Sequence, residues 1–84
     1  MENGRIKRID TSVQQWLRSN KRISVTPELV IGELVNEGFY DTSSDSLELF
    51  IQEIRTMTKK EQREYLNIYR IGEKDIRFKN RENF

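Results

Sequence analysis

The 84-residue sequence contains neither cysteine nor histidine. Without cysteine the chain has no disulfides and no thiolate metal sites, which is compatible with a cytoplasmic location. Without histidine it also lacks Ser-His and Cys-His nucleophilic systems, His-ligated zinc sites and the usual pH-sensing side chain. These absences exclude the commonest catalytic centres. We therefore expect no enzyme, no cofactor and no bound metal.

Apolar residues are also scarce, since 35% of the chain is hydrophobic and another 35% is charged. The N-terminal stretch MENGRIKRIDTS has no apolar run after its basic residues, unlike a secretory signal. The apolar run LVIGELV is far shorter than the roughly 20 residues that span a bilayer. We expect a soluble, cytoplasmic protein with one domain over residues 1–84. Its small core would gain stability from dimerisation or partner binding.

The net charge of +1 conceals three segments of alternating sign. Residues 1–26 contain six basic and two acidic residues, residues 27–57 contain one and seven, and residues 58–84 contain eight and five. The segment charges are therefore +4, −6 and +3. An acidic centre argues against a central DNA-recognition helix, because phosphates would repel it. The basic ends remain candidate contacts.

The clearest helix signals surround residues 27–37. Thr26 is a favourable N-cap, and Pro27 fits the first helical position, where a missing N–H costs nothing. Val25 and Val30 occupy the two positions of a hydrophobic staple. At the other end, Gly38 can adopt the left-handed conformation that closes a helix. The sequence therefore predicts a central helix with signals at both ends.

Two further helices are predicted after the polar connector YDTSSDS. Ser44 or Asp45 can cap the first, and its apolar residues recur at helical spacing over residues 45–57. That stripe consists of Leu47, Phe50, Ile51, Ile54 and Met57. The sequence TKKE at residues 58–61 forms a capping box for the next helix, with Gly72 as its predicted stop. We therefore expect helices over residues 45–57 and 59–71.

The two ends of the chain carry weaker patterns. Asp10 is a candidate N-cap for a short helix over residues 11–19, while the preceding GRIKRI could fray or pack through its isoleucines. After Gly72, EKDIRFKNRENF alternates apolar and basic residues. A short edge strand or a hairpin with NIYRI are alternatives, but we favour an extended basic tail over residues 73–84, partly docked by Ile76 and Phe78. The expected fold is mainly α: a small bundle of three to four short helices followed by this tail.

Several aromatic and basic residues are candidates for partner binding. Trp16 is either an interface hot spot or the residue that docks the first helix. Tyr65 and Tyr69 could stack on bases or grip a partner, or form an amphipathic border. Basic tail residues could meet phosphate or an acidic protein surface, or remain solvated. The candidates for partner binding are Trp16, Tyr65, Tyr69, Arg77 and Lys79, with Arg63, Arg70, Lys74 and Arg81 nearby.

Asp41, Asp45 and Glu48 have the only spacing that suggests a cation site. Calcium loops need further alternating oxygen ligands, a central glycine and a distant glutamate, which are missing here. Helix capping and interaction with the helix dipole therefore explain these acidic residues better.

Residues 21–57 partly resemble the ribbon-helix-helix family, through KRISV, TPEL and VNEGFYDTSSDSLELFIQEIR. The resemblance implies that strands from two chains pair and enter the major groove of DNA. Arg22 and Ser24 would then face DNA, while Ile23 and Val25 would face the dimer core. Helix 27–37 is about one turn shorter than that family's first helix, and the connector after it is longer.

The sequence favours a non-enzymatic small regulatory protein, a regulator or inhibitor that acts by binding another protein. Its composition is typical of phage or mobile-element regulators. A homodimer is compatible with the small core, while no membrane or small-molecule substrate is expected. The alternative is a DNA-binding transcriptional regulator of ribbon-helix-helix type, with Arg22 and Ser24 as contacts.

Overall fold

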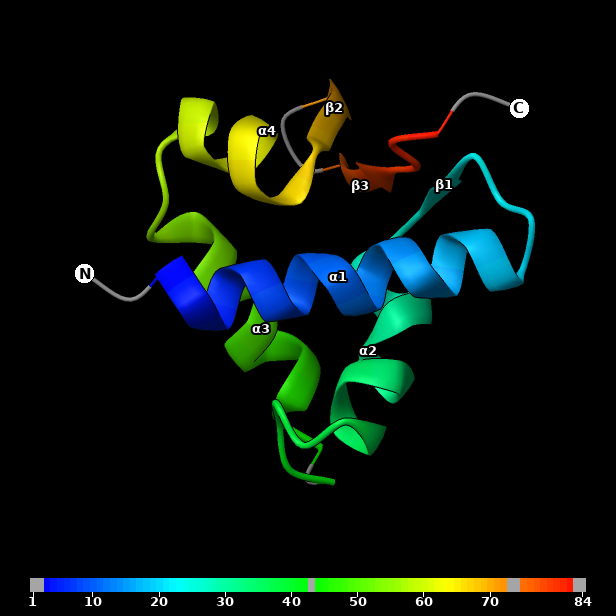
Figure 1. Cartoon of the computed structure of the whole chain (residues 1–84). Helices are drawn as coiled ribbons and strands as arrows, with labels where there is room; N and C mark the ends of the chain where they lie inside the picture. The colour runs from blue at the N-terminus through cyan, green and yellow to red at the C-terminus, as the bar shows by residue number, and fades with distance from the viewer. Residues whose placement is uncertain (1–2, 43, 73–74, 83–84) are drawn as a thin grey trace.

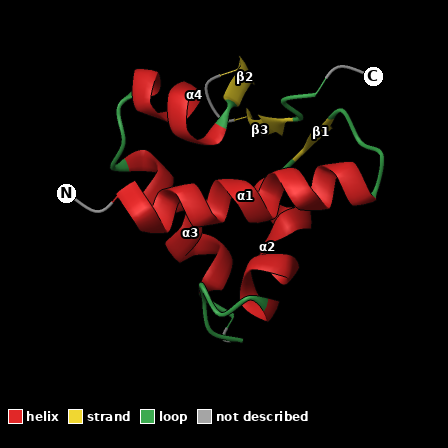
Figure 2. Ribbon diagram, viewed as in Figure 1, coloured by secondary structure: helices red, strands yellow, loops and turns green. Residues whose placement is uncertain are grey.

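The computed structural model describes residues 3–42, 44–72 and 75–82, which form four helices and a three-stranded sheet (Figures 1 and 2). The elements are α1 (Asn3–Ser19), β1 (Ser24–Val25), α2 (Pro27–Asn36), α3 (Ser46–Arg55), α4 (Lys59–Leu66), β2 (Ile68–Gly72) and β3 (Asp75–Lys79). Helix α1 crosses the middle of the molecule, with the sheet and α4 on one side and α2 and α3 on the other (Figure 1). The predicted mainly α-helical fold is confirmed.

Helix α1 is longer than predicted, because it begins at Asn3 and not at residue 11. Asp10, predicted as its N-cap, lies within the helix. Ile9 continues the stripe of Val13 and Leu17 at helical spacing, and all three side chains are fully buried. Packing of this extended stripe against the other elements explains why the polar first turns are helical.

Helix α2 closes as the sequence predicts. Gly38 has a φ of 87°, and its N–H donates to the carbonyl of Val35 at 3.0 Å. The N–H of Phe39 donates to the carbonyl of Leu34 at 2.9 Å, which completes a Schellman motif. At the other end Thr26 is the N-cap, but its side chain makes no capping hydrogen bond.

Helix α3 runs from Ser46 to Arg55, so it begins one residue later and ends two residues earlier than predicted. Asp45 occupies the N-cap position, but the side-chain capping bond expected there is absent. The Ser46 hydroxyl instead donates to the carbonyl of Asp41, which anchors the connector to the start of the helix. Phe50 and Ile54 are buried, as the apolar stripe predicted.

Helix α4 starts where predicted and ends early. The Glu61 N–H donates to the Thr58 hydroxyl at 3.1 Å, and the Thr58 N–H donates to the Glu61 carboxylate at 2.8 Å, so the capping box is confirmed. The helix ends at Leu66 because Asn67 adopts the left-handed conformation, with φ 52° and ψ 43°. Asparagine tolerates this region better than most residues. The predicted end at residue 71, with Gly72 as the stop, is therefore wrong.

The C-terminal segment is extended and docked through Ile76 and Phe78, as predicted, but it is not a tail, because β3 is the central strand of the antiparallel sheet β1–β3–β2. The hairpin of β2 with β3, one of the two alternatives, is the observed structure. Phe78 pairs with Val25 on one side and with Ile68 on the other, and Ile76 is buried beside it. The alternation of apolar residues in this segment reflects one buried sheet face.

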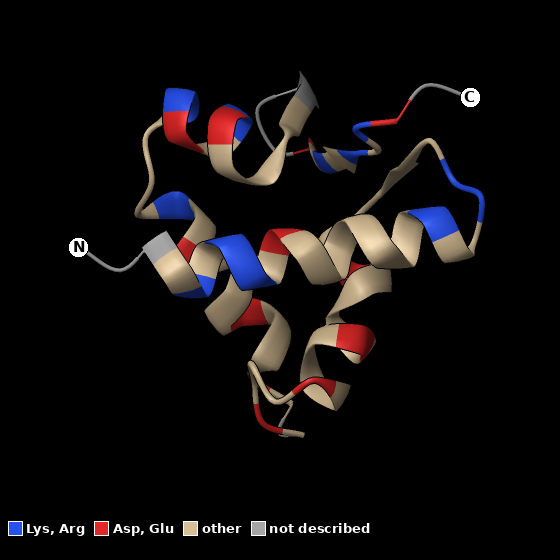
Figure 3. Ribbon diagram, in the orientation of Figure 1, with Lys and Arg blue, Asp and Glu red and all other residues tan. Residues whose placement is uncertain are grey.

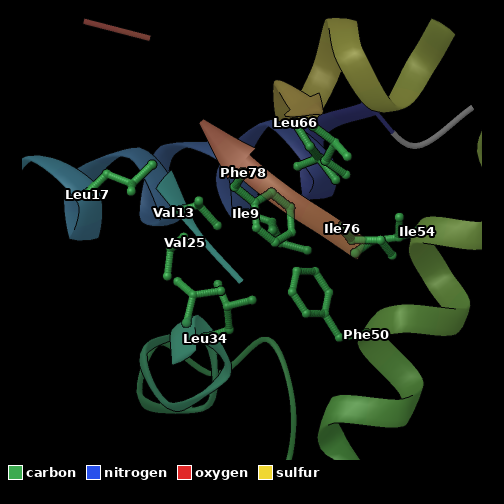
Figure 4. Close-up of a cluster of buried hydrophobic side chains, with 12 residues drawn as sticks. Ile9, Val13, Leu17, Val25, Leu34, Phe50, Ile54, Leu66, Ile76 and Phe78 are labelled. Carbon is green, nitrogen blue, oxygen red and sulfur yellow. The ribbon is translucent and has the colours of Figure 1, made fainter. Parts of the chain in front are cut away.

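The core lies between this sheet face, α1, α2 and α3 (Figure 4). The rings of Phe50 and Phe78 stack with centroids 5.7 Å apart and an interplanar angle of 7°. Buried Gln14 donates to the Lys79 carbonyl at 2.8 Å and accepts from the Arg81 N–H at 2.9 Å. These two bonds join α1 to the end of β3.

Candidate binding surfaces

The segregation of charge along the sequence becomes a segregation in space. The residues from Ile23 to Ile54 include no lysine or arginine, and they form β1, α2, the connector and most of α3. Figure 3 shows acidic residues over α2, the connector and α3, and basic residues on α1, the loop after α1 and β3. Helix α4 carries both signs.

One carboxylate of residues 23–54, which we call the acidic segment, is paired with an arginine. The Glu53 carboxylate lies 3.1 Å from the Arg5 Nε and also accepts a hydrogen bond from the Tyr40 hydroxyl at 2.6 Å. Arg5 donates in addition to the Phe39 carbonyl at 3.2 Å, and its guanidinium lies 5.2 Å from the Tyr40 ring centroid. This cluster ties the start of α1 to the connector and α3.

The pKa values of this cluster follow from its burial and hydrogen bonds. Burial acts to raise the pKa of Glu53, but hydrogen bonds from Arg5 and Tyr40 outweigh burial and hold that pKa below its usual range. Burial and the neighbouring Glu53 raise the pKa of Tyr40. At pH 7 the Glu53 carboxylate therefore stays ionised and the Tyr40 phenol stays neutral. These are the protonation states in which the carboxylate accepts hydrogen bonds from both Arg5 and Tyr40.

The other six carboxylates of the acidic segment form no ion pair with a described lysine or arginine. They are Glu28, Glu33, Glu37, Asp41, Asp45 and Glu48. Like charges gathered on a small surface repel each other and attract a cationic partner.

A groove of about 490 Å³ lies between α2, the connector and the start of α3. Ile31, Val35 and Leu47 supply its apolar lining, and all three are partly buried. Gly32 also lines it, and a Cβ at this position would meet no atom within 4 Å. The remaining lining residues are Asn36, Thr42, Ser44 and Ser46. The groove thus has apolar and small polar walls and lies within the acidic segment.

A second surface, which we call the Tyr69 face, lies on the sheet and α4. Tyr69 is 43% exposed and lines two hollows of about 320 and 440 Å³. Lys59 and Arg63 line the first hollow, beside Gln62 and Ile68, and Lys79 lines the second with Arg81. The Lys79 ammonium lies 5.0 Å from the centre of the Tyr69 ring. This surface combines an exposed aromatic ring with cationic side chains.

The structure brings together three of the five residues predicted to bind a partner. Arg77 lies opposite Tyr69 in the β2–β3 register, and the Lys79 ammonium lies over one face of the Tyr69 ring. Tyr65 and Tyr69 do not share a helix, because α4 ends between them. Tyr65 and Trp16 are partly buried against the core, which is the structural role considered for both.

The basic residues near the C-terminus differ in their ion pairs and hydrogen bonds. Arg77 forms an ion pair with Asp75 at 3.4 Å. Arg81 pairs with Asp10 at 3.2 Å and donates to the carbonyls of Glu64 and Tyr65 at the end of α4. Burial raises the pKa of Asp10, although Arg81 opposes the shift. Arg81 therefore joins α1 to the end of α4. Lys74 lies outside the described residues.

The segment expected to read DNA already has a partner strand within the chain. Ser24 and Val25 pair with Lys79 and Phe78 of β3, so a second chain could add only at the remaining edge of β1. Val25 is buried in the chain's own core, whereas Ile23 is 71% exposed. Arg22 is exposed and Ser24 is partly buried. Their role in binding DNA stays a prediction.

The sequence interpretation missed the groove, although Gly32 was a signal for it. A glycine inside a helix lowers stability relative to alanine and indicates a packing or functional reason.

Among the described residues, no group of three acidic side chains converges to hold a metal ion. None of the described helices is long and apolar enough to cross a membrane. Comparisons with protein-family models, curated proteins and solved structures found no match.

Proposed function

We propose that this chain is a non-enzymatic regulatory protein of the cytoplasm that acts by binding another protein. The docking site is the groove between α2 and α3, and its occupant is a cationic amphipathic segment of the partner. The observation that carries the proposal is the open groove at Gly32, which lies within residues 23–54, where the sequence has no lysine or arginine.

The chemistry of the groove selects this occupant. Its apolar residues, Ile31, Val35 and Leu47, suit the apolar face of a helix laid between α2 and α3. The missing side chain at Gly32 leaves room for close approach of that helix. Carboxylates on both flanking elements, including Glu28 and Glu48, form no ion pair with a described lysine or arginine, and they favour a cationic side chain beside the apolar face. The proposal thus specifies the partner by charge and pattern.

A peptide titration tests the proposal. The probe is a 15-residue lysine–leucine peptide with one apolar helical face, and the control peptide has the same composition in an order without that face. We expect the amphipathic peptide to bind at least tenfold more tightly, measured by calorimetry and by amide chemical shifts. The largest shifts are expected at Ile31, Gly32 and Leu47.

Two matched variants locate the binding. Gly32→Leu fills the groove, and Gly4→Leu makes the same change in α1, where a Cβ also meets nothing within 4 Å. We expect Gly32→Leu to weaken peptide binding at least tenfold and Gly4→Leu to leave it unchanged. Equal binding by both peptides, or to both variants, would refute the proposal and leave only general charge attraction.

Sedimentation of the protein alone distinguishes a second copy from a foreign partner. A dimer that Gly32→Leu dissociates would place another copy of the chain in the groove and overturn the proposal. A chain that stays monomeric while binding the amphipathic peptide supports it.

A further inference from the structure

The Tyr69 face lies outside the groove between α2 and α3 and shares no lining residue with it. Tyr69 is one of the few large apolar side chains that the described part of the fold leaves exposed. Strand β2 places its ring beside α4 on one side and β3 on the other, so the ring lines both hollows. An exposed ring in this position offers a flat surface for stacking.

Cations border both hollows. Lys59 and Arg63 come from α4, one turn apart, and neither forms an ion pair with a described carboxylate. Lys79 comes from β3 and lies over the Tyr69 ring. Arg81 lines the second hollow but is held by Asp10. Lys59, Arg63 and Lys79 are thus available to an anion on either side of the ring.

We propose that the Tyr69 face binds single-stranded nucleic acid, with a base stacked at Tyr69 and the flanking phosphates held by Lys59, Arg63 and Lys79. In a single strand each base lies between two phosphates, which matches an aromatic ring with cations on both sides. An acidic peptide without aromatic residues would satisfy the cations but has no flat ring for Tyr69. A duplex would present phosphates while keeping its bases stacked inside.

The test uses fluorescein-labelled 12-mers of thymidine and of uridine, a 12-base-pair duplex and polyglutamate, with binding followed by anisotropy. We expect one or both single strands to bind more tightly than the duplex and polyglutamate. The two single-stranded probes distinguish DNA from RNA. Each phosphate contact in a single strand contributes a salt slope of about −0.7, so three cations give a slope of about −2.

Substitutions of Tyr69 separate stacking from charge. Loss of one stacked base corresponds to a loss in affinity of about 5- to 150-fold. We expect that loss for Tyr69→Leu, which keeps an apolar side chain on β2, and a change of less than about twofold for Tyr69→Phe. Circular dichroism and urea unfolding of each variant show whether the fold is retained.

Charge-matched double variants locate the phosphate contacts. Lys59→Gln with Arg63→Gln should reduce the salt slope by about 1.4, that is, two contacts of about 0.7 each. Lys7→Gln with Arg8→Gln removes the same charge from exposed positions of α1 and should leave the slope unchanged. Equal effects of the two pairs, tighter binding of polyglutamate or duplex, or unchanged affinity in Tyr69→Leu would each overturn the proposal.

Discussion

Replacement of Phe78 by alanine tests the central feature of the fold, the burial of a segment whose sequence reads as a basic tail. The Phe78 side chain is 0% exposed and stacks on Phe50. Removing a buried phenylalanine costs about 3–5 kcal/mol, because transfer energy is lost and a cavity remains. A chain of this length has a total stability of roughly 4–13 kcal/mol. Phe78→Ala therefore removes a large part of the stability.

The measurement is urea unfolding, followed by circular dichroism and by the fluorescence of Trp16. Phe78→Leu, which retains most of the buried volume, should lose about 1–2 kcal/mol and provides a variant that still folds. Tyr69→Leu on the neighbouring strand should change stability by less than about 1 kcal/mol, because its ring is 43% exposed. A loss below about 1 kcal/mol for Phe78→Ala would mean that this segment lies outside the core, and the structural reasoning would fail.

Three further predictions concern glycine, helix caps and pH. Gly32→Ala should raise the free energy of unfolding by about 0.5–1 kcal/mol. Gly38→Ala should lower it by about 1 kcal/mol, because Gly38 has a φ of 87°. Thermal melts should therefore show changes in melting temperature of opposite sign. Thr58→Ala should lower the free energy of unfolding by about 1 kcal/mol, and Thr26→Ala by less than about 0.5 kcal/mol. The reason is that Thr58 makes a side-chain capping bond and Thr26 does not. Equal losses of stability in urea unfolding would contradict this prediction. Glu53→Gln should lower stability at pH 7 by about 1–2 kcal/mol. Because folding lowers the pKa of Glu53, its contribution to stability is present above the unfolded pKa of about 4.3 and is lost as the pH falls through the folded pKa. The difference in stability between Glu53→Gln and wild type should therefore shrink in unfolding curves below about pH 4.

The candidate sites were only partly predictable. The sequence identified Tyr69, Arg77 and Lys79 as separate candidates on a helix and a tail, and the hairpin makes them neighbours. Lys59 joins the same face only because α4 packs beside β2. The groove depends on how α2 and α3 approach each other, which no local pattern specifies.

Local signals determined much of the helical structure from the sequence alone. The Gly38 closure of α2 and the Thr58 capping box of α4 are both observed, because each depends on residues within a few positions of one another. The apolar stripe of α3 is likewise a local pattern, and it correctly placed Phe50 and Ile54 in the core. The acidic centre of the chain was also visible from composition.

Tertiary structure decided the ends of the chain. Helix α1 extends back to Asn3 because Ile9 gains from burial against elements far along the sequence. The segment around Phe78 becomes a strand only when Val25 and Ile68 supply its hydrogen-bonded neighbours on both sides. A strand is stabilised by partners that need not be near it in sequence, whereas a helix satisfies its backbone within its own residues. For this reason the sequence determined the interior helices of this protein, and only the folded chain determined its sheet.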